Sequence, residues 1–232
     1  MALALSLLTT TLLCPATATL RVGAFNIQAF GDTKMSNERV AGIIVNILRR
    51  YDVVLVQEVR DSDLSAVTEL MEQLNSVSTS TYDYEISGPL GRDNYKEMYL
   101  FIYRTDTVSV VDTYQYEDPQ DVFSREPFIL KISVPHTKVE EFVLVPLHSA
   151  PHDAVAEIDA LYDVYLAIVS KWGTDSDCAY DRGVIVVCGA KLKRSIVPNS
   201  AAIYNFQRAF QLEQEEALAV SDHYPVEVKL TA

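Results

Sequence analysis

The sequence predicts an α/β protein in which two β-sheets pack against each other and helices cover their outer faces. Many short apolar runs bounded by turn residues are typical of strands, and three longer segments repeat apolar residues at helical spacing. The run DVVLVQE at 52–58 is apolar at consecutive positions, which is typical of a strand covered on both faces. Each sheet then has one face on its partner and one face under helices.

The individual elements follow from the same patterns in chain order. Helices are expected around the apolar stripes of 40–48 and 64–74 and over 153–172, with Asp61 positioned to cap the second and Asp153 to begin the third. The third helix carries its apolar positions at Ile158, Leu161, Tyr162, Tyr165, Leu166 and Val169. The expected strands are 20–28, 52–58, 82–86, 97–103, 107–112, 127–134, 141–147, 184–187 and 223–230.

Residues 1–19 are set apart from the rest of the chain. They contain no charged side chain, are apolar through Leu13 and end in small residues, which predicts a secretory signal peptide cleaved near Ala18 or Thr19. A buried N-terminal helix is the alternative. The run is too short to cross a bilayer, so we expect a soluble secreted protein without a membrane segment. Residues 20–232 contain no linker, repeat or low-complexity tract, which predicts a single domain.

The formal net charge of −13 argues against long-range attraction to nucleic acid. This net charge is compatible with a local cationic track for DNA. A solvated acidic surface explains the net charge equally well. No Asn-x-Ser/Thr sequence occurs, so N-glycosylation is not expected.

Cysteine usage is unusual for a secreted chain. Removal of the signal peptide leaves Cys178 and Cys188, ten positions apart in a stretch that has the pattern of a single strand. Two positions on one extended strand do not come within disulfide reach, so we expect both cysteines to be unpaired. Two unpaired cysteines in an oxidising compartment indicate that a partner is missing.

Polar residues stand at the ends of the apolar runs. Asn26, Glu58 and His148 each close a run, and Asp222-His223 precedes the last one. Histidines suit proton transfer near neutral pH, and carboxylate and amide oxygens suit Mg²⁺, Ca²⁺ or Mn²⁺. No Cys/His cluster fits zinc. Each residue alone is explained as well by a structural histidine or a solvated strand end, but together they favour metal-assisted cleavage of a phosphodiester.

Such cleavage requires an activated water, a proton for the leaving oxygen and positive charge for the phosphoryl oxygens. The chain has four histidines. His136 follows a proline in a turn and His152 lies at the start of a helix, so we expect both to be solvated surface residues.

Longer blocks of sequence resemble the deoxyribonuclease I family. They are PLGRDNYKEMYLFIYR at 89–104, SREP at 124–127, LHSAP at 147–151, DAVAEIDALYDVY at 153–165, CAYDR at 178–182 and SDHYPVEV at 221–228. The resemblance covers residues 20 to about 172 and 178–230. It implies a four-layer sandwich of two packed mixed sheets flanked by helices, secretion as a monomer, and Ca²⁺- and Mg²⁺-dependent endonucleolytic cleavage of double-stranded DNA.

The resemblance also implies roles for individual residues. His148 matches one catalytic histidine and Glu97 its carboxylate partner, while His223 matches the second histidine and Asp181 the carboxylate paired with it. The positions around the metal and the scissile phosphate are Asn26, Glu58 and Asp222. The positions that contact DNA are Arg60 and Arg125, at phosphate or the minor groove, and Tyr95, which packs on a deoxyribose. Contacts of this kind imply little sequence specificity.

The sequence departs from the family between Trp172 and Cys178, where it has only residues 173–177. The family has several tens of residues here, including a strand that ends in Gly-Asp-Phe-Asn and supplies an Asp and an Asn to the site. The same stretch supplies the cysteine that pairs with the position of Cys178. We therefore expect a central strand to be missing, which deprives its neighbours of ladder partners.

These observations leave three functional hypotheses. The leading one is a secreted endonuclease whose activity is reduced or lost through the gap, and the alternative is an inactive isoform that binds DNA or a protein. A phosphodiesterase for lipid or inositol phosphates is the third, but the YKE and SREP blocks favour DNA. Actin is a partner that the resemblance raises, and Glu85 disfavours it because it places a charge in the corresponding segment.

Overall fold

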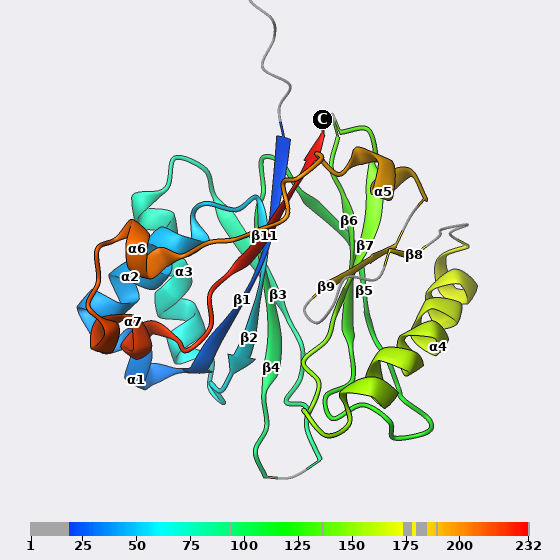
Figure 1. Ribbon diagram of the computed structural model, residues 1–232, viewed down its shortest axis with the longest axis horizontal. Helices are drawn as coiled ribbons and strands as arrows, with labels where there is room; N and C mark the ends of the chain where they lie inside the picture. The colour runs from blue at the N-terminus through cyan, green and yellow to red at the C-terminus, as the bar shows by residue number, and fades with distance from the viewer. Residues whose placement is uncertain are drawn as a thin grey trace, which may run out of the picture.

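The computed structural model describes residues 19–92, 94–135, 137–173, 178–179, 185–188 and 190–231. Its strands form two sheets that pack face to face, and helices lie on the outer side of each sheet (Figure 1). This arrangement is the predicted α/β sandwich. Residues 1–18 of the predicted signal peptide, His136 and Asp181 lie outside the described residues. Across the part of the chain that is described, no helix has the length and apolar character to cross a membrane.

The first sheet is mixed and runs in the order β10-β11-β1-β2-β4-β3, with β1 and β2 parallel and the other neighbours antiparallel. Its strands are β1 Thr19–Phe30, β2 Val53–Val59, β3 Tyr82–Ile86, β4 Met98–Arg104, β10 Ala202–Ile203 and β11 Val226–Thr231. In β2, Val53 and Leu55 face the second sheet while Val54 and Val56 face the helices. Because both faces of β2 are buried, the strand has no polar position between Val53 and Val56.

The second sheet is antiparallel throughout its described strands, in the order β5-β6-β7-β9-β8. Its strands are β5 Ser109–Gln115, β6 Phe128–Ser133, β7 Glu141–Pro146, β8 Cys178–Ala179 and β9 Ile185–Cys188. The sequence gap had led us to expect that strands next to it would lack partners. Instead β7 pairs with β6 on one side and with β9 on the other, from Val143 opposite Cys188 to Pro146 opposite Ile185. β9, which follows the gap in the sequence, thus provides β7 with a hydrogen-bonded neighbour on its second side.

The expectation that Cys178 and Cys188 share one strand is wrong. The chain reverses between β8 and β9, and the register of these strands places Cys178 directly opposite Cys188. Separation along a single strand therefore does not keep the two residues apart, and the geometric reason for expecting both to be unpaired falls away.

Three apolar cores lie between the four layers. The first fills the space between the first sheet and the helices on its outer face, the second lies between the two sheets, and the third lies between the second sheet and α4. The helices are α1 Asp32–Met35, α2 Glu38–Leu48, α3 Ser65–Val77, α4 Ala154–Trp172, α5 Ala190–Ser195, α6 Phe206–Ala209 and α7 Gln214–Val220. In Figure 1, α4 stands alone on the outer face of the second sheet, opposite α1, α2, α3, α6 and α7.

The buried face of α4 differs from its predicted apolar positions. Ile158, Tyr162 and Leu166 are exposed, and the side chains that face the sheet are Glu157, Leu161, Val164 and Ile168. The helix carries apolar residues around most of its circumference, so their spacing alone does not select the buried face. The second helix also begins later than Asp61, at Ser65, but Asp61 still accepts a hydrogen bond from the backbone N–H of Val67 at 2.8 Å.

Candidate active site

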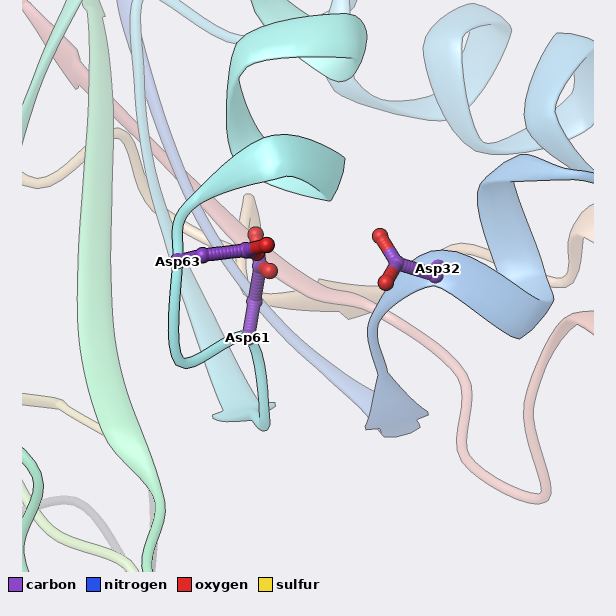
Figure 2. Close-up of side chains that lie close together, drawn as sticks. All are labelled: Asp32, Asp61 and Asp63. Carbon is purple, nitrogen blue, oxygen red and sulfur yellow. The ribbon is translucent and has the colours of Figure 1, made fainter.

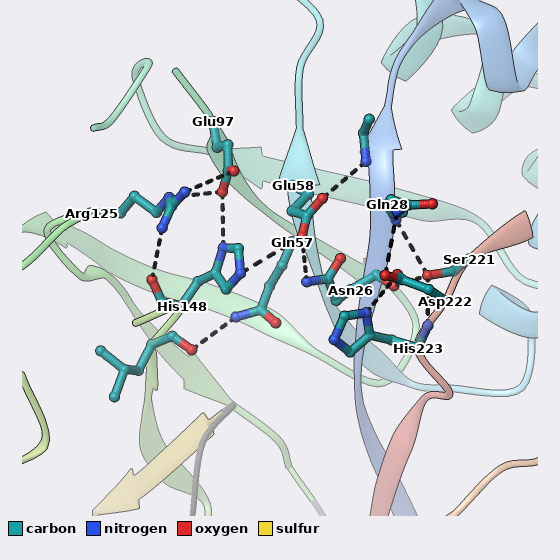
Figure 3. A network of polar contacts seen from close by, with 12 residues as sticks. Asn26, Gln28, Gln57, Glu58, Glu97, Arg125, His148, Ser221, Asp222 and His223 are labelled. Carbon is teal, nitrogen blue, oxygen red and sulfur yellow. Dashed lines mark hydrogen bonds and ion pairs between the residues drawn. The ribbon is translucent and has the colours of Figure 1, made fainter. Parts of the chain in front are cut away.

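Seven of the predicted site residues meet at one edge of the sandwich in Figure 3, and they are Asn26, Glu58, Glu97, Arg125, His148, Asp222 and His223. β1 and β2 are parallel, so Asn26 and Glu58 lie near the same ends of neighbouring strands. β4 is antiparallel to β2, which brings Glu97, just before β4, to that edge. His148 follows the end of β7, and His223 precedes β11. The fold therefore gathers residues that are far apart in the sequence. Ser221 and Asn26, for example, are joined by a hydrogen bond although 195 positions separate them.

Glu97, His148 and Arg125 form one side of the site. Nδ1 of His148 lies 2.9 Å from Oε2 of Glu97, and Arg125 binds the same carboxylate with Nε 2.9 Å from Oε2 and Nη2 3.0 Å from Oε1. Burial alone would raise the pKa of Glu97, but the hydrogen bond from His148 and the charges of His148 and Arg125 outweigh it and lower the pKa. Because an ionised carboxylate only accepts, Nδ1 of His148 carries the proton and Nε2 is left for chemistry.

His223 and Asp222 form the opposite side of the site. Nδ1 of His223 lies 2.8 Å from Oδ1 of Asp222, so this histidine too turns Nε2 away from its carboxylate. Asp222 also accepts a hydrogen bond from Nε2 of Gln28 at 3.3 Å. The sequence predicts Asp181 as the partner of His223, and Asp181 lies outside the described residues. Within the described part of the chain, the carboxylate at Nδ1 is that of the sequence neighbour.

Asn26 and Glu58 lie between the two histidine–carboxylate pairs in Figure 3. Nδ2 of Asn26 donates to Oε1 of Glu58 at 2.8 Å, and the backbone N–H of Ala29 donates to Oε2 at 3.1 Å. Nε2 of His148 lies 3.7 Å from Oε1 of Glu58, which connects this pair to the first histidine.

The backbone at Glu58 departs from regular strand geometry. Glu58 has a φ of 61°, in the left-handed region that non-glycine residues seldom adopt, and the ladders of β2 shift register around it. Ala29, which binds its carboxylate, also has a positive φ of 49°. Such strain persists where surrounding contacts hold it, and here those contacts aim Glu58 into the site.

The donor set fits a hard divalent cation. Asn26 is only 8% exposed, and its buried Oδ1 has no hydrogen-bond partner among the described residues. A buried amide oxygen without a donor is costly unless something else satisfies it. The carboxylate of Glu58 adjoins it, and oxygen ligands of this type are those that Mg²⁺ and Ca²⁺ prefer.

Arg60 and Tyr95, which the sequence predicts to contact DNA, lie against each other. The guanidinium of Arg60 is 3.8 Å from the centre of the Tyr95 ring, a distance typical of cation–π stacking. Tyr95 is 44% exposed, so part of its ring remains available. Arg125, the third residue that the sequence predicts to contact DNA, forms an ion pair with Glu97, which in turn contacts His148.

Several supporting residues were missed by the sequence interpretation. The buried Tyr99 hydroxyl accepts a hydrogen bond from the backbone N–H of His148 at 2.9 Å, and burial raises the pKa of that hydroxyl. Ser221 Oγ donates to the carbonyl of Asn26 at 2.8 Å and accepts from the N–H of His223 at 3.1 Å. Ser221 thereby joins the segment of one histidine to the end of β1. Both residues sit in recognised blocks, but neither has a sequence signal of its own.

Glu157 on α4 is a further supporting residue that the sequence interpretation missed. It is 0% exposed, and its Oε1 accepts hydrogen bonds from Oγ of Ser124 at 2.7 Å and the N–H of Ala150 at 3.1 Å. Ser124 precedes Arg125 and Ala150 follows His148 by two residues, so Glu157 joins the segments that carry them. Glu157 lies on the same face of α4 as Leu161, Val164 and Ile168, and because apolar spacing does not select that face, the buried charge could not be found from the sequence.

A second group of carboxylates consists of Asp32, Asp61 and Asp63 (Figure 2). Its oxygens already serve the start of α3. Oγ of Ser65 donates to Oδ1 of Asp32 and to Oδ1 of Asp63 at 2.7 Å each, and Asp61 accepts from Val67. This cluster has a structural explanation and is separate from the residues around the two histidines.

Comparison with known proteins agrees with this geometry. Residues 23–176 match the model of the Endonuclease/Exonuclease/phosphatase family. Deoxyribonuclease-1-like 2 of Mus musculus is 53% identical over 254 residues, covering 90% of this chain and 91% of that protein. Deoxyribonuclease-1 of Oryctolagus cuniculus is 47% identical over 275 residues, covering 97% of each. Both aligned lengths exceed the 232 residues of this chain, so the relatives contain residues without a counterpart here.

Solved structures show the same fold at much lower identity. The crystal structure of humanized D. rerio TDP2 superposes with a TM-score of 0.58 at 15% identity and covers 92% of this chain and 99% of that one. A family protein from Bacteroides thetaiotaomicron gives 0.53 at 12% identity and covers 92% and 95%. The family model and the relatives together place this chain in the endonuclease/exonuclease/phosphatase family, among the deoxyribonuclease I proteins.

Proposed function

We propose that this chain is a divalent-metal-dependent endonuclease that hydrolyses phosphodiester bonds of double-stranded DNA with little sequence specificity. The observation that carries the proposal is the placement of Asn26 and Glu58 between two histidine–carboxylate pairs, Glu97–His148 and Asp222–His223. The relatives named deoxyribonuclease support DNA as the substrate.

The two histidines supply the proton transfers. Each holds its Nδ1 proton on a carboxylate, so Nε2 of one accepts the proton of the attacking water and Nε2 of the other gives a proton to the leaving 3′ oxygen. The carboxylates Glu97 and Asp222 stabilise the charged imidazoles and fix their orientation. The two pairs are equivalent in this respect, and His148 and His223 are interchangeable in the two roles on geometry alone.

Asn26 and Glu58, with Asp222, would hold the cation. A bound Mg²⁺, with Ca²⁺ and Mn²⁺ as further candidates, would supply positive charge to the phosphoryl oxygens. The orphaned Oδ1 of Asn26 supports this assignment because it offers a lone pair that no described protein donor uses.

Arg60, Tyr95 and Arg125 would position the duplex. Arginine side chains bind phosphates or the minor groove, and the Tyr95 ring packs against deoxyribose, so binding depends on backbone shape more than on base identity. With a formal charge of −13, the protein should bind DNA weakly and with strong dependence on salt.

We further propose that residues 20–232 form one domain that is secreted after cleavage near Ala18 or Thr19. β1 begins at Thr19, so cleavage there leaves the strand nearly complete. N-terminal sequencing of protein collected from the medium tests the cleavage site.

Plasmid nicking tests the enzymatic proposal. The purified chain should convert supercoiled plasmid to open circles with Mg²⁺ and Ca²⁺ and not in EDTA. His148→Ala and His223→Ala should each lower the rate by about 10² or more, because a general acid or base contributes roughly this factor. Glu72→Gln, an exposed position on α3, is the control. Unchanged nicking by a folded histidine variant would remove that histidine from the mechanism.

One observation favours a second candidate, an inactive form that binds DNA or a protein. The relatives contain residues that this chain lacks. The same assay separates the two, because a folded wild-type protein that binds duplex DNA without nicking it is the inactive form.

A further inference from the structure

The two histidine–carboxylate pairs of the candidate site differ in burial. In the first pair, the side chain of Glu97 is 4% exposed and that of His148 is 23% exposed. In the second pair, the side chains of Asp222 and His223 are 43% and 54% exposed. Fewer packed atoms therefore hold the second pair, and its orientation depends more on how the backbone that carries it is anchored.

That backbone leaves the C-terminal end of α7, which ends at Val220, two residues before Asp222. The last carbonyls of a helix have no partner within the helix and carry a partial negative charge. Lys34 binds two of them. Its Nζ donates to the carbonyl of Ala219 at 2.8 Å and to the carbonyl of Val220 at 2.9 Å.

Both ends of this contact are fixed by the same apolar core. Lys34 belongs to α1, a short helix that lies near α7 in Figure 1. The next residue, Met35, is 1% exposed in the core between the first sheet and the helices on its outer face. Val220 is fully buried in that core. The side chain of Lys34 thus connects two elements whose positions the core already determines.

Ser221 connects the end of α7 to the second pair. Its N–H donates to the carbonyl of Ala217 at 3.0 Å, which continues the hydrogen bonding of the helix. Its Oγ donates to the carbonyl of Asn26 at 2.8 Å and accepts from the N–H of His223 at 3.1 Å. A shift of the last turn of α7 would therefore move the backbone of His223 relative to Asn26.

The charge of Lys34 also lies close to the site. Burial lowers the pKa of its ammonium group, and the negative charges of Asp222 and Glu58 act in the opposite direction. Each histidine–carboxylate pair thus has a cation near it. Arg125 binds the carboxylate of the first pair directly, whereas Lys34 binds the backbone that leads to the second.

We propose that Lys34 is a positioning residue for the reaction, which holds the end of α7 and thereby sets the orientation of Asp222 and His223. The inference rests on the proposed function and deepens it, because it names a residue outside the site on which the second histidine depends. In this role Lys34 touches neither DNA nor a reacting atom. Its loss should therefore lower kcat and leave KM for DNA unchanged.

Replacement of Lys34 by Met removes the ammonium group and keeps an unbranched side chain. In steady-state nicking assays, kcat of Lys34→Met should fall about tenfold while KM stays within about twofold, since a displacement of about 1 Å in a catalytic group can cost up to about 10² in rate. Lys34→Arg keeps a cation with several N–H donors and should retain at least about a third of the wild-type kcat.

Arg39→Met is the matched control. Arg39, on α2, forms an ion pair with Glu216 in the first turn of α7, at the end of the helix away from Asp222. If Lys34 only stabilised α7, loss of either cation would have a similar effect, so kcat of Arg39→Met should equal that of the wild type. The proposal is wrong if Lys34→Met keeps the wild-type kcat, if Arg39→Met loses as much, or if Lys34→Arg recovers nothing. A rise in KM with unchanged kcat would also contradict it.

Hydrogen exchange tests the anchor without cleavage and so separates this inference from the proposed function. In Lys34→Met, the backbone amides of Ser221 and His223 should exchange at least about tenfold faster than in the wild type, because the segment opens more often. Arg39→Met should leave their exchange unchanged. A wild type that does not nick DNA, with faster exchange in Lys34→Met, would retain the anchor and lose the enzymatic proposal. Unchanged exchange in Lys34→Met would show that Lys34 does not hold the segment, whatever the activity.

Discussion

Oε2 of Glu97 lies 2.9 Å from Nδ1 of His148, and Arg125 binds the same carboxylate with Nε 2.9 Å from Oε2 and Nη2 3.0 Å from Oε1. Glu97 is only 4% exposed, so the three side chains form a nearly buried unit at the start of β4. The hydrogen bond from His148 and the charges of His148 and Arg125 lower the pKa of Glu97 and keep it ionised, and the ionised carboxylate fixes the tautomer and the orientation of the histidine. In the proposed mechanism, Arg125 thus acts on catalysis through Glu97 as well as by contacting the DNA.

Replacement of Glu97 by Gln tests this relationship. The amide keeps the shape but cannot stabilise a charged imidazole, so the rate of plasmid nicking should fall by about tenfold to 10². The pKa of Glu97 in the folded chain lies below its ordinary value of 4.5. The ionised group thus stabilises the fold above about pH 4.5, and this contribution is lost as the pH falls through the lower folded-state pKa.

Urea unfolding at two pH values measures the stability part of this prediction. The loss of unfolding free energy in Glu97→Gln should be larger at pH 7 than at pH 3, because the stability that the ionised carboxylate contributes is lost as the pH falls through its lowered folded-state pKa. An equal loss at both values would mean that the charge of Glu97 does not stabilise the fold.

The position of the cation is tested by metal-dependent thermal stability. Added Mg²⁺ or Ca²⁺ should raise the melting temperature of the wild type, since a ligand that binds the folded state stabilises it. Asn26→Ala and Glu58→Gln should lose most of this rise. Asp63→Asn, in the carboxylate cluster at the start of α3, should keep it. The reverse result would move the metal to Asp32, Asp61 and Asp63.

The fold, and the edge of the sandwich at which the candidate site lies, could be predicted from the sequence for a physical reason. Apolar runs of strand length report burial directly, and polar residues at their ends collect wherever neighbouring strands share an edge. Asn26 and Glu58 are such a case. The left-handed backbone of Glu58 was not accessible, because a positive φ in a glutamate depends on contacts with Ala29 and the ladders on both sides.

Tertiary contacts determine the features of the fold that the sequence did not predict. β8 and β9 are antiparallel and place Cys178 opposite Cys188, and although the sequence between them contains Asp181 and Gly183, residue types that favour turns, the apolar pattern was interpreted as a single strand. Ile158 is exposed on α4 because the sheet contacts the opposite face of the helix, which apolar spacing could not identify. Pairing of β7 with β9 likewise joins two segments that the apolar pattern of the sequence does not connect.

Replacement of Glu157 tests whether its contacts with Ser124 and Ala150 hold the site in place. Glu157→Ala leaves the buried donors of Ser124 and Ala150 without their acceptor, at about 1–3 kcal/mol for each unsatisfied group. The segments that carry Arg125 and His148 should loosen, so kcat should fall about tenfold and KM should rise, since Arg125 is proposed to position the duplex. Glu157→Gln retains an acceptor oxygen and should restore most of the activity. Equal kcat in folded Glu157→Ala and wild type would show that these segments need no such connection.

The gap after Trp172 allows a comparison of two forms of the same protein. One is this chain, and the other carries, between Trp172 and Cys178, the corresponding residues of the Mus musculus relative, whose alignment exceeds the length of this chain. The sequence resemblance implies that the added stretch supplies an Asp and an Asn to the site, so the restored form should nick plasmid much faster with Mg²⁺ and Ca²⁺.

Insertion of the added stretch should change the stability of the protein less than its activity. β7 is already paired on both sides in this chain, so unpaired backbone at that strand does not add to the cost of the gap. Loss of a native disulfide from a secreted domain costs about 2–5 kcal/mol, and restoring the partner of Cys178 should recover that amount at most. Parallel expression with the signal peptide, followed by assays of secreted yield, free thiols and nicking, measures all three. Equal specific activity in the two forms would mean that the residues of this chain complete the site without the added stretch.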